Sequence, residues 1–162
     1  MSYPEPHYHS DTGAASATFR PSTHPPELTY PSGGAAHYLA TGASTGGGFG
    51  LYRWEMAARP SGPEPHFHKT ISESFYILSG SVRLFDGASW IEGTPGDYLF
   101  VPEGGIHAFR NESGLPASML ILFAPGAPRE DYFETLKRLG EGLVLSDEEK
   151  TAFFLRHDTY WL

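Results

Sequence analysis

Two clusters of ligand-type side chains constrain the fold of this chain more than any other feature. The first cluster holds His66, His68 and Glu73, and the second holds His107. Because His66 and His68 are two residues apart, an extended strand points both imidazoles to one face, whereas a helix would spread them by about 200°. Strands that are distant in sequence meet around one interior in a β-barrel. We therefore expect a β-barrel that brings the four side chains together.

The composition of this set indicates one metal ion. Three imidazoles and one carboxylate suit one divalent transition metal ion (Fe, Mn, Ni, Co, Cu or Zn), and ligand type alone does not choose among these. A lone buried histidine is more often a hydrogen-bonded core residue than a ligand, but four such residues at this joint spacing favour metal binding. An octahedral ion held by four protein ligands keeps two open positions, which chemistry requires.

Short strand-like runs recur at even intervals through the middle of the chain, separated by turn residues. The chain has 19 glycines and 14 prolines, a composition that favours turns and short strands. This pattern predicts an all-β barrel or sandwich. The expected strands cover residues 35–40, 51–57, 74–78, 81–85, 89–92, 98–101, 106–110 and 117–123.

Period-two alternation indicates which side chains face the interior. If Glu73 faces inward, Phe75 and Ile77 do too, and Phe109 accompanies His107. Within residues 98–101, either the even-numbered or the odd-numbered pair joins them. In the run 51–57, the apolar set Tyr52, Trp54 and Met56 is the one that we expect inside. Such a lining suits an aromatic or hydrophobic small molecule, although any small barrel is filled by these residue types.

The two ends of the chain differ from the middle. Residues 1–34 show no sustained period and are expected to form an irregular N-terminal arm, from which residues 17–20 or 28–30 could add a strand to a partner subunit. Residues 35–126 would form the barrel. Residues 127–162 predict two α-helices packed on the outside of the barrel or at a subunit contact, the second beginning at a capping box of Ser146 and Glu149.

The bulk composition excludes several classes of partner. The formal net charge of −8 argues against nucleic acid and against an anionic membrane. The apolar run 119–124 is too short to span a bilayer. The chain has no cysteine and no visible secretory signal, so we expect a soluble, cytoplasmic protein that acts on a small molecule.

The two clusters resemble the two signature motifs of the cupin superfamily. The first motif departs from the family pattern at Pro60, where the family has a glycine, and Gly62 is placed to serve the same bend. The match covers about a third of the chain, and its joint spacing is specific. The matching residues are His66, His68, Glu73 and Gly80 in the first motif and Gly96, Pro102, Gly104, His107 and Asn111 in the second.

The resemblance implies a fold, a site and a set of activities. The fold would be a double-stranded β-helix, or jelly roll, and His66, His68, Glu73 and His107 would bind the metal. The family includes quercetinase-type dioxygenases, isomerases, decarboxylases and polyketide cyclases. We rank first a dioxygenase-type oxidoreductase for a small aromatic or enolic compound, with Glu73 also catalytic as a proton acceptor. The alternatives are a metal-dependent isomerase or cyclase and a non-catalytic binding protein. Small cupins are commonly dimers, which implies a homodimer.

Overall fold

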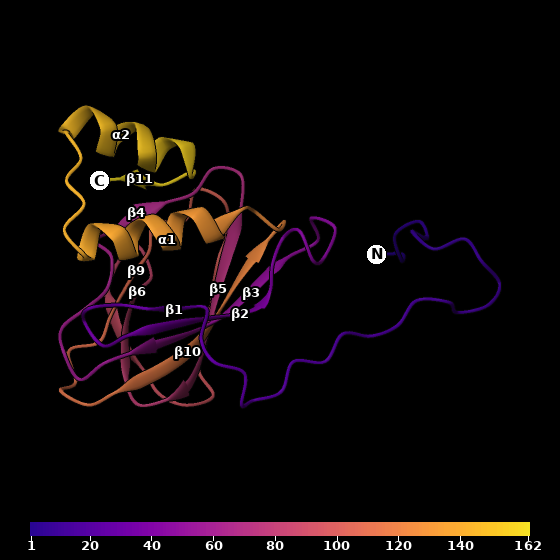
Figure 1. The fold of residues 1–162 in the computed structure, drawn as a ribbon, viewed down its shortest axis with the longest axis horizontal. Coiled ribbons are helices and arrows are strands. Elements are labelled where there is room, and N and C mark those ends of the chain that lie inside the picture. The colour runs from indigo at the N-terminus through magenta and orange to yellow at the C-terminus, as the bar shows by residue number, and fades with distance from the viewer.

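A computed structural model describes all 162 residues, Met1 to Leu162, and its chain is dominated by short strands (Figure 1). Two helices follow the last long strand, and a short strand ends the chain. The strands are β1 (Leu28–Thr29), β2 (Ala35–Ala40), β3 (Gly50–Met56), β4 (His66–Phe67), β5 (Ser72–Ser79), β6 (Val82–Phe85), β7 (Trp90–Gly93), β8 (Tyr98–Val101), β9 (Ala108–Arg110), β10 (Ala117–Ala124) and β11 (Tyr160–Trp161). The helices are α1 (Arg129–Gly140) and α2 (Asp147–Arg156).

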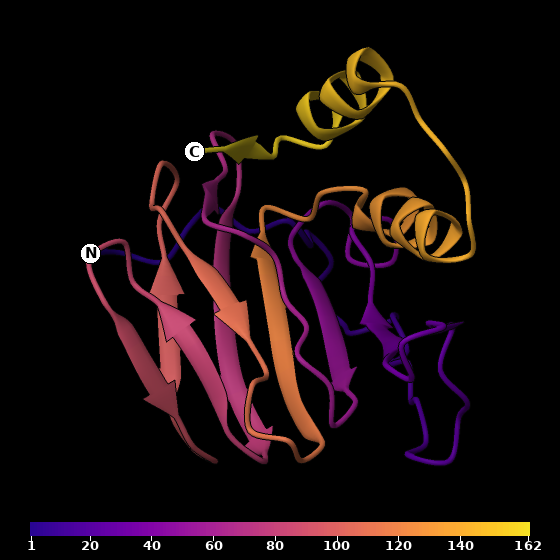
Figure 2. The same cartoon turned by 90° about the vertical axis from the view of Figure 1, so that its left-hand side faces the viewer.

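The strands form a six-stranded sheet in the order β1-β2-β3-β10-β5-β8 and a three-stranded sheet in the order β7-β6-β9. All pairs are antiparallel, and the long strands β3, β10 and β5 lie side by side (Figure 2). Single bridges join β4 and the segment before it to the residues on either side of β9, at His66–His107 and Ser61–Asn111. The expected all-β jelly roll is confirmed, and each of the expected strands overlaps an observed one.

Both sheets pack on one apolar core. Ile121 of β10 lies between Tyr52 of β3 and Phe75 of β5 in the sheet register, and all three side chains are buried. Met56 is also buried and Trp54 packs against the core, so the predicted inward face of β3 is confirmed.

Pairing with β5 decides the orientation of β8, which the alternation had left open. Val101 is buried and Leu99 packs against the core, whereas Tyr98 and Phe100 are 61% and 55% exposed. Every position of this strand is apolar or aromatic, so periodicity alone could not distinguish its faces. The register opposite Glu73 and Phe75 makes the odd-numbered residues the inner ones.

The two helices lie at the same end of the strands (Figure 2). Tyr132 and Phe133 of α1 belong to the same buried cluster as the sheets, and the Tyr132 ring stacks on Phe153 of α2 with centroids 5.3 Å apart. The predicted capping box is present at Ser146 and Glu149. Neither helix is long and apolar enough to cross a lipid bilayer.

The two ends of the chain lie differently relative to the barrel. After α2, strand β11 pairs with β4, which sets Trp161 opposite His66. Much of the N-terminal arm extends away from the barrel (Figure 1). Leu28 and Thr29 pair with β2 of the same chain and form the edge of the six-stranded sheet, so this part of the expected irregular arm is a strand.

Gly62 provides the bend that Pro60 cannot. Its φ is +141°, and a Cβ atom built there would lie 1.8 Å from the backbone oxygen of Phe109. Only glycine permits this close approach of two backbone segments. The approach carries the chain from β3 into β4, and so brings the His-x-His segment against the strand that follows His107.

Candidate metal centre

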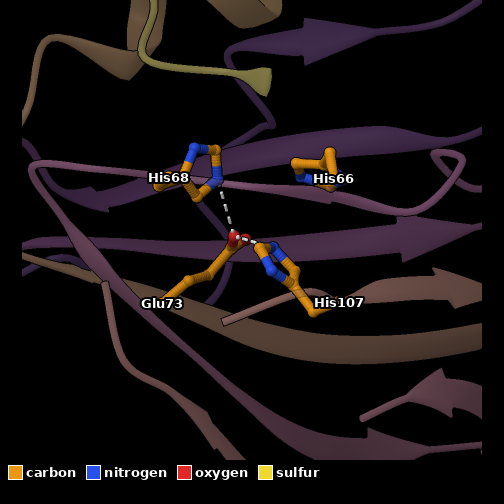
Figure 3. Close-up of side chains that lie close together, drawn as sticks. All are labelled: His66, His68, Glu73 and His107. Carbon is orange, nitrogen blue, oxygen red and sulfur yellow. Dashed lines mark hydrogen bonds and ion pairs between the residues drawn. The ribbon is translucent and has the colours of Figure 1, made fainter. Parts of the chain in front are cut away.

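The structure brings His66, His68, Glu73 and His107 together in the interior (Figure 3). One ligand atom from each lies within 4.8 Å of the others, and all four side chains are buried. They come from β4 and the residue after it, from β5, and from the residue before β9. The sequence-predicted residues therefore form one group that could hold a metal ion.

Backbone pairing positions the group. His66 and His107 exchange two backbone hydrogen bonds, in which each N–H donates to the other's carbonyl at 3.0 and 2.9 Å. Residues opposite each other in such a pair present their side chains to the same face, and the two imidazole centroids are 4.3 Å apart. Glu73 lies opposite Phe123 in the register of β5 and β10, so it enters the same interior from the larger sheet.

Each of the three imidazoles is oriented by a backbone carbonyl. Nδ1 donates from His66 to Glu64 O at 2.8 Å, from His68 to Asp158 O at 2.6 Å and from His107 to Gly105 O at 3.0 Å. A carbonyl oxygen can only accept, so Nδ1 carries hydrogen in each ring and Nε2 is left for another partner. Metal-binding histidines usually show this arrangement, because the outer hydrogen bond fixes the tautomer and the ring plane.

The carboxylate of Glu73 occupies the side toward which the imidazoles turn. Its Oε2 is 3.1 Å from Nε2 of His68 and 2.8 Å from Nε2 of His107 (Figure 3). Without an ion, the charges in this group compensate one another. Burial by itself would raise the pKa of Glu73, but the His107 and His68 side chains hold it well below its ordinary value.

The pKa values of His107 and His66 shift in opposite directions. Burial would lower the pKa of His107, but the Glu73 carboxylate raises it above 6.5. Burial and the neighbouring His107 charge lower the pKa of His66 to about 4. His66 is therefore neutral at neutral pH and ready to act as a ligand, whereas His107 must lose its second proton first. The donor set fits a divalent transition metal ion, since neutral imidazole nitrogens and one carboxylate are suitable ligands.

Asn111, the last residue of the second motif, is structural. Its side chain is fully buried and its Nδ2 donates to the carbonyls of Ala57 at 3.0 Å and Leu115 at 2.8 Å. Its Oδ1 accepts from the backbone N and the hydroxyl of Ser113 at 3.1 and 2.8 Å. Asn111 thus closes the turn between β9 and β10 and does not face the metal group.

A cavity of about 360 Å³ leads to this group, within the range of small-molecule sites. His66 and Glu73 line one part of it, and the C-terminal residues Arg129, Phe154 and Trp161 line another. The helices therefore contribute to the cavity, where the sequence had suggested only an outer layer. The spacing of these residues along the chain gave no sign of this, because they reach the cavity only through the packing of α1, α2 and β11.

Comparison with known proteins identifies the class. Residues 52–123 match the family described as the cupin domain, so this segment of the chain is a cupin domain. The chain is 32% identical over 91 residues to quercetin 2,3-dioxygenase of Bacillus subtilis, a match that covers 56% of this chain. The matched segment spans only 26% of the length of that enzyme.

Solved structures share the fold. KdgF from a Halomonas species superposes with a TM-score of 0.61 at 16% identity, covering 72% of this chain and 99% of the other. The polyketide cyclase RemF from Streptomyces resistomycificus superposes with a TM-score of 0.55 at 22% identity, covering 71% and 82%. At these identities the likeness concerns the double-stranded β-helix alone.

Proposed function

We propose that this chain is a metal-dependent cupin enzyme, in which His66, His68, Glu73 and His107 hold one divalent transition metal ion. The single observation that supports this most strongly is the orientation of the three imidazoles. All three use Nδ1 for a backbone carbonyl, and two of the Nε2 atoms already converge on Glu73 Oε2. A purely structural cluster would not require all three rings to use the same nitrogen, Nδ1, for the backbone.

We further propose a dioxygenase-type oxidoreductase that acts on a small aromatic or enolic compound. When bound, the ion would supply Lewis-acid or redox chemistry at its open positions. Glu73 would hold a substrate proton at Oε2, and the apolar walls would keep water from the reacting atoms. The partial match to a quercetin dioxygenase supports this class over the others.

Metal content tests the site directly. Untagged protein, loaded with Zn²⁺ or Mn²⁺ and dialysed, should retain about one ion per chain by elemental analysis, whereas His68→Gln and Glu73→Gln should retain far less. The exposed His7 and His9 in the arm could bind ions adventitiously. A His7→Gln/His9→Gln variant is the matched control, and it should bind as the unaltered chain does. Equal metal content in all variants would refute the site.

Oxygen uptake tests the chemistry. With quercetin as the probe and each candidate metal in turn, the protein should consume O₂ with loss of the flavonol absorbance, and Glu73→Gln should change the dependence of the rate on pH. Substrate conversion under anaerobic conditions would instead indicate an isomerase or cyclase. Tight binding without conversion would indicate a non-catalytic binding protein.

The proposed homodimer also needs its own measurement. Strand β8 lies at the edge of the six-stranded sheet, and its outward side chains Tyr98 and Phe100 are exposed. Exposed apolar side chains beside an unpaired edge favour association with a second copy. Light scattering should give twice the chain mass, and a Tyr98→Glu/Phe100→Glu variant should give the mass of one chain.

A further inference from the structure

A positively charged side chain lines the cavity, and the proposed metal centre does not explain why it is there. Arg129, the first residue of α1, lines the same cavity as His66 and Glu73 and comes from outside the segment that matches the cupin domain. Its residue exposure is only 4%. A guanidinium stays charged at any physiological pH, and burying a charge is costly unless it is paired.

Little of the hydrogen-bonding capacity of Arg129 is used within the chain. Nη1 donates to the backbone carbonyl of His157 at 2.8 Å, a bond that ties α1 to the segment after α2. Nε is buried and has no partner. Arg129 takes part in none of the ion pairs of the chain, although a guanidinium has five N–H donors in a fork that matches a carboxylate.

The acids nearest to Arg129 in sequence are engaged elsewhere. Glu130 accepts a hydrogen bond from the hydroxyl of Tyr52 at 2.6 Å. Oδ2 of Asp131 lies 3.1 Å from Nε2 of His157. The first turn of a helix also disfavours a cation, because the helix dipole is positive there. Arg129 therefore has no acidic partner, although it lies at the end of the helix where the dipole disfavours a positive charge.

Aromatic rings hold the guanidinium in place. Its central carbon lies 4.1 Å from the ring centroid of Tyr132 and 4.9 Å from that of Phe123. Such contacts compensate part of the burial and act on the flat face of the group. The N–H donors lie at its edge, so they remain able to bind an anion.

We propose that Arg129 is the carboxylate-binding residue of the cavity and that the natural ligand is a small aromatic or enolic carboxylate. The acid group would pair with the guanidinium, and the body of the ligand would pack on Phe123, whose ring also lies 6.3 Å from that of His68. This inference deepens the proposed function and rests on it only for the other end of the ligand, which would reach the metal centre.

Charge balance favours the same class of ligand. A divalent ion with the Glu73 carboxylate leaves one positive charge, and Arg129 adds another beside the same cavity. A carboxylate that also presents an enolate or phenolate oxygen would neutralise both. The chain as a whole is negative, with a formal net charge of −8, so long-range attraction does not recruit an anion and its recognition must be local.

Matched ligands test the proposal in the unaltered chain. Cinnamate and cinnamamide have nearly the same shape and differ in charge, and their dissociation constants can be measured by calorimetry in metal-free and Zn²⁺-loaded protein. We expect cinnamate to bind about 10- to 100-fold more tightly than the amide in both forms, as a charged hydrogen-bonded pair implies. Equal affinity for the acid and the amide in metal-free protein would overturn the proposal.

Variants then assign the preference to one side chain. Arg129→Met keeps the apolar bulk and should reduce the acid-to-amide ratio to about one, whereas Arg138→Met removes an exposed arginine of the same helix and should leave the ratio unchanged. A retained preference in Arg129→Met would overturn the proposal. If that variant does not fold, Arg129→Lys keeps the charge without the fork and must lower the ratio; an unchanged ratio would be equally contrary.

The two proposals fail separately. A cinnamate preference that depends on Arg129, in a chain that retains no metal, would overturn the metal-dependent function and leave the carboxylate site standing. Normal metal binding with no preference for the acid would overturn the carboxylate site and leave the metal-dependent function standing.

Discussion

Asp158 offers a sharp test of how the C-terminal segment supports the metal centre. Its backbone oxygen accepts from Nδ1 of His68 at 2.6 Å. Its carboxylate accepts from the backbone N–H of Lys69 and of Thr70 and from the Thr70 hydroxyl, at 3.0, 2.8 and 2.7 Å. The side chain therefore clamps the segment after His68, and the same residue's carbonyl sets the ring. Asp158→Gly would remove the carboxylate that holds Lys69 and Thr70. The carbonyl of residue 158 would remain, but it would no longer be held firmly against Nδ1 of His68.

The cost can be worked from these contacts. Hydrogen bonds to a charged group contribute about 1.5–3 kcal/mol each when buried, but Asp158 is partly exposed, so about 0.5–1 kcal/mol for each of the three is a fairer figure. Asp158 also has a φ of +54°, where glycine relieves about 1 kcal/mol of strain. The net loss of unfolding free energy in Asp158→Gly should be about 0.5–2 kcal/mol, a fall in Tm of about 1–8 °C.

Metal affinity should fall more than stability does. Loss of the partner that orients a metal-binding imidazole typically weakens binding about 10- to 100-fold. Competition of metal-free protein with a chromophoric chelator for Zn²⁺ measures the dissociation constant. The control is Asp158→Asn, because asparagine tolerates a positive φ and still accepts hydrogen bonds, and it should stay within about threefold of the unaltered chain. An Asp158→Gly protein with a lowered Tm and unchanged Zn²⁺ affinity would refute the link to His68.

Three further predictions follow from the same geometry. Asn111→Ala should lower the free energy of unfolding by about 2–5 kcal/mol, because it removes a fully buried side chain and its hydrogen bonds to the carbonyls of Ala57 and Leu115, and chemical denaturation should show Ser113→Ala to cost much less. Zn²⁺ binding at pH 6.5 should release protons, because the raised pKa of His107 keeps its ring charged until the ion displaces the Nε2 hydrogen; calorimetric enthalpies that do not vary between buffers of different ionisation enthalpy would contradict this. Burial alone would raise the pKa of Asp158, but the hydrogen bonds from Thr70 and Lys69 lower it. Its stabilisation should therefore be complete above the ordinary pKa of 3.8 and disappear as the pH falls below that value, so the unfolding free energies of the unaltered chain and Asp158→Asn should converge in acid.

Strand positions were predictable because they depend on local alternation. The runs 35–40 and 98–101 have the same bounds in the sequence and in the structure, and the capping box at Ser146 was recognised from two residues. The face of β8 was not predictable, since all its residues are apolar and only its pairing with β5 distinguishes them. The second strand of the β4–β11 pair was missed as well, because two residues are too few to show a period.

By itself the sequence determined which side chains can form the candidate metal centre. The spacing of His66 and His68 sets two imidazoles on one face of a strand, and this holds wherever that strand lies in the fold. Tertiary structure alone decided what surrounds them. Asp158 reaches His68 across 90 positions, and Arg129 enters the cavity from a helix that sequence placed outside the barrel. Such contacts depend on how α1 and β11 pack over the end of the strands, and packing between distant segments leaves no periodic trace in the residues that make it.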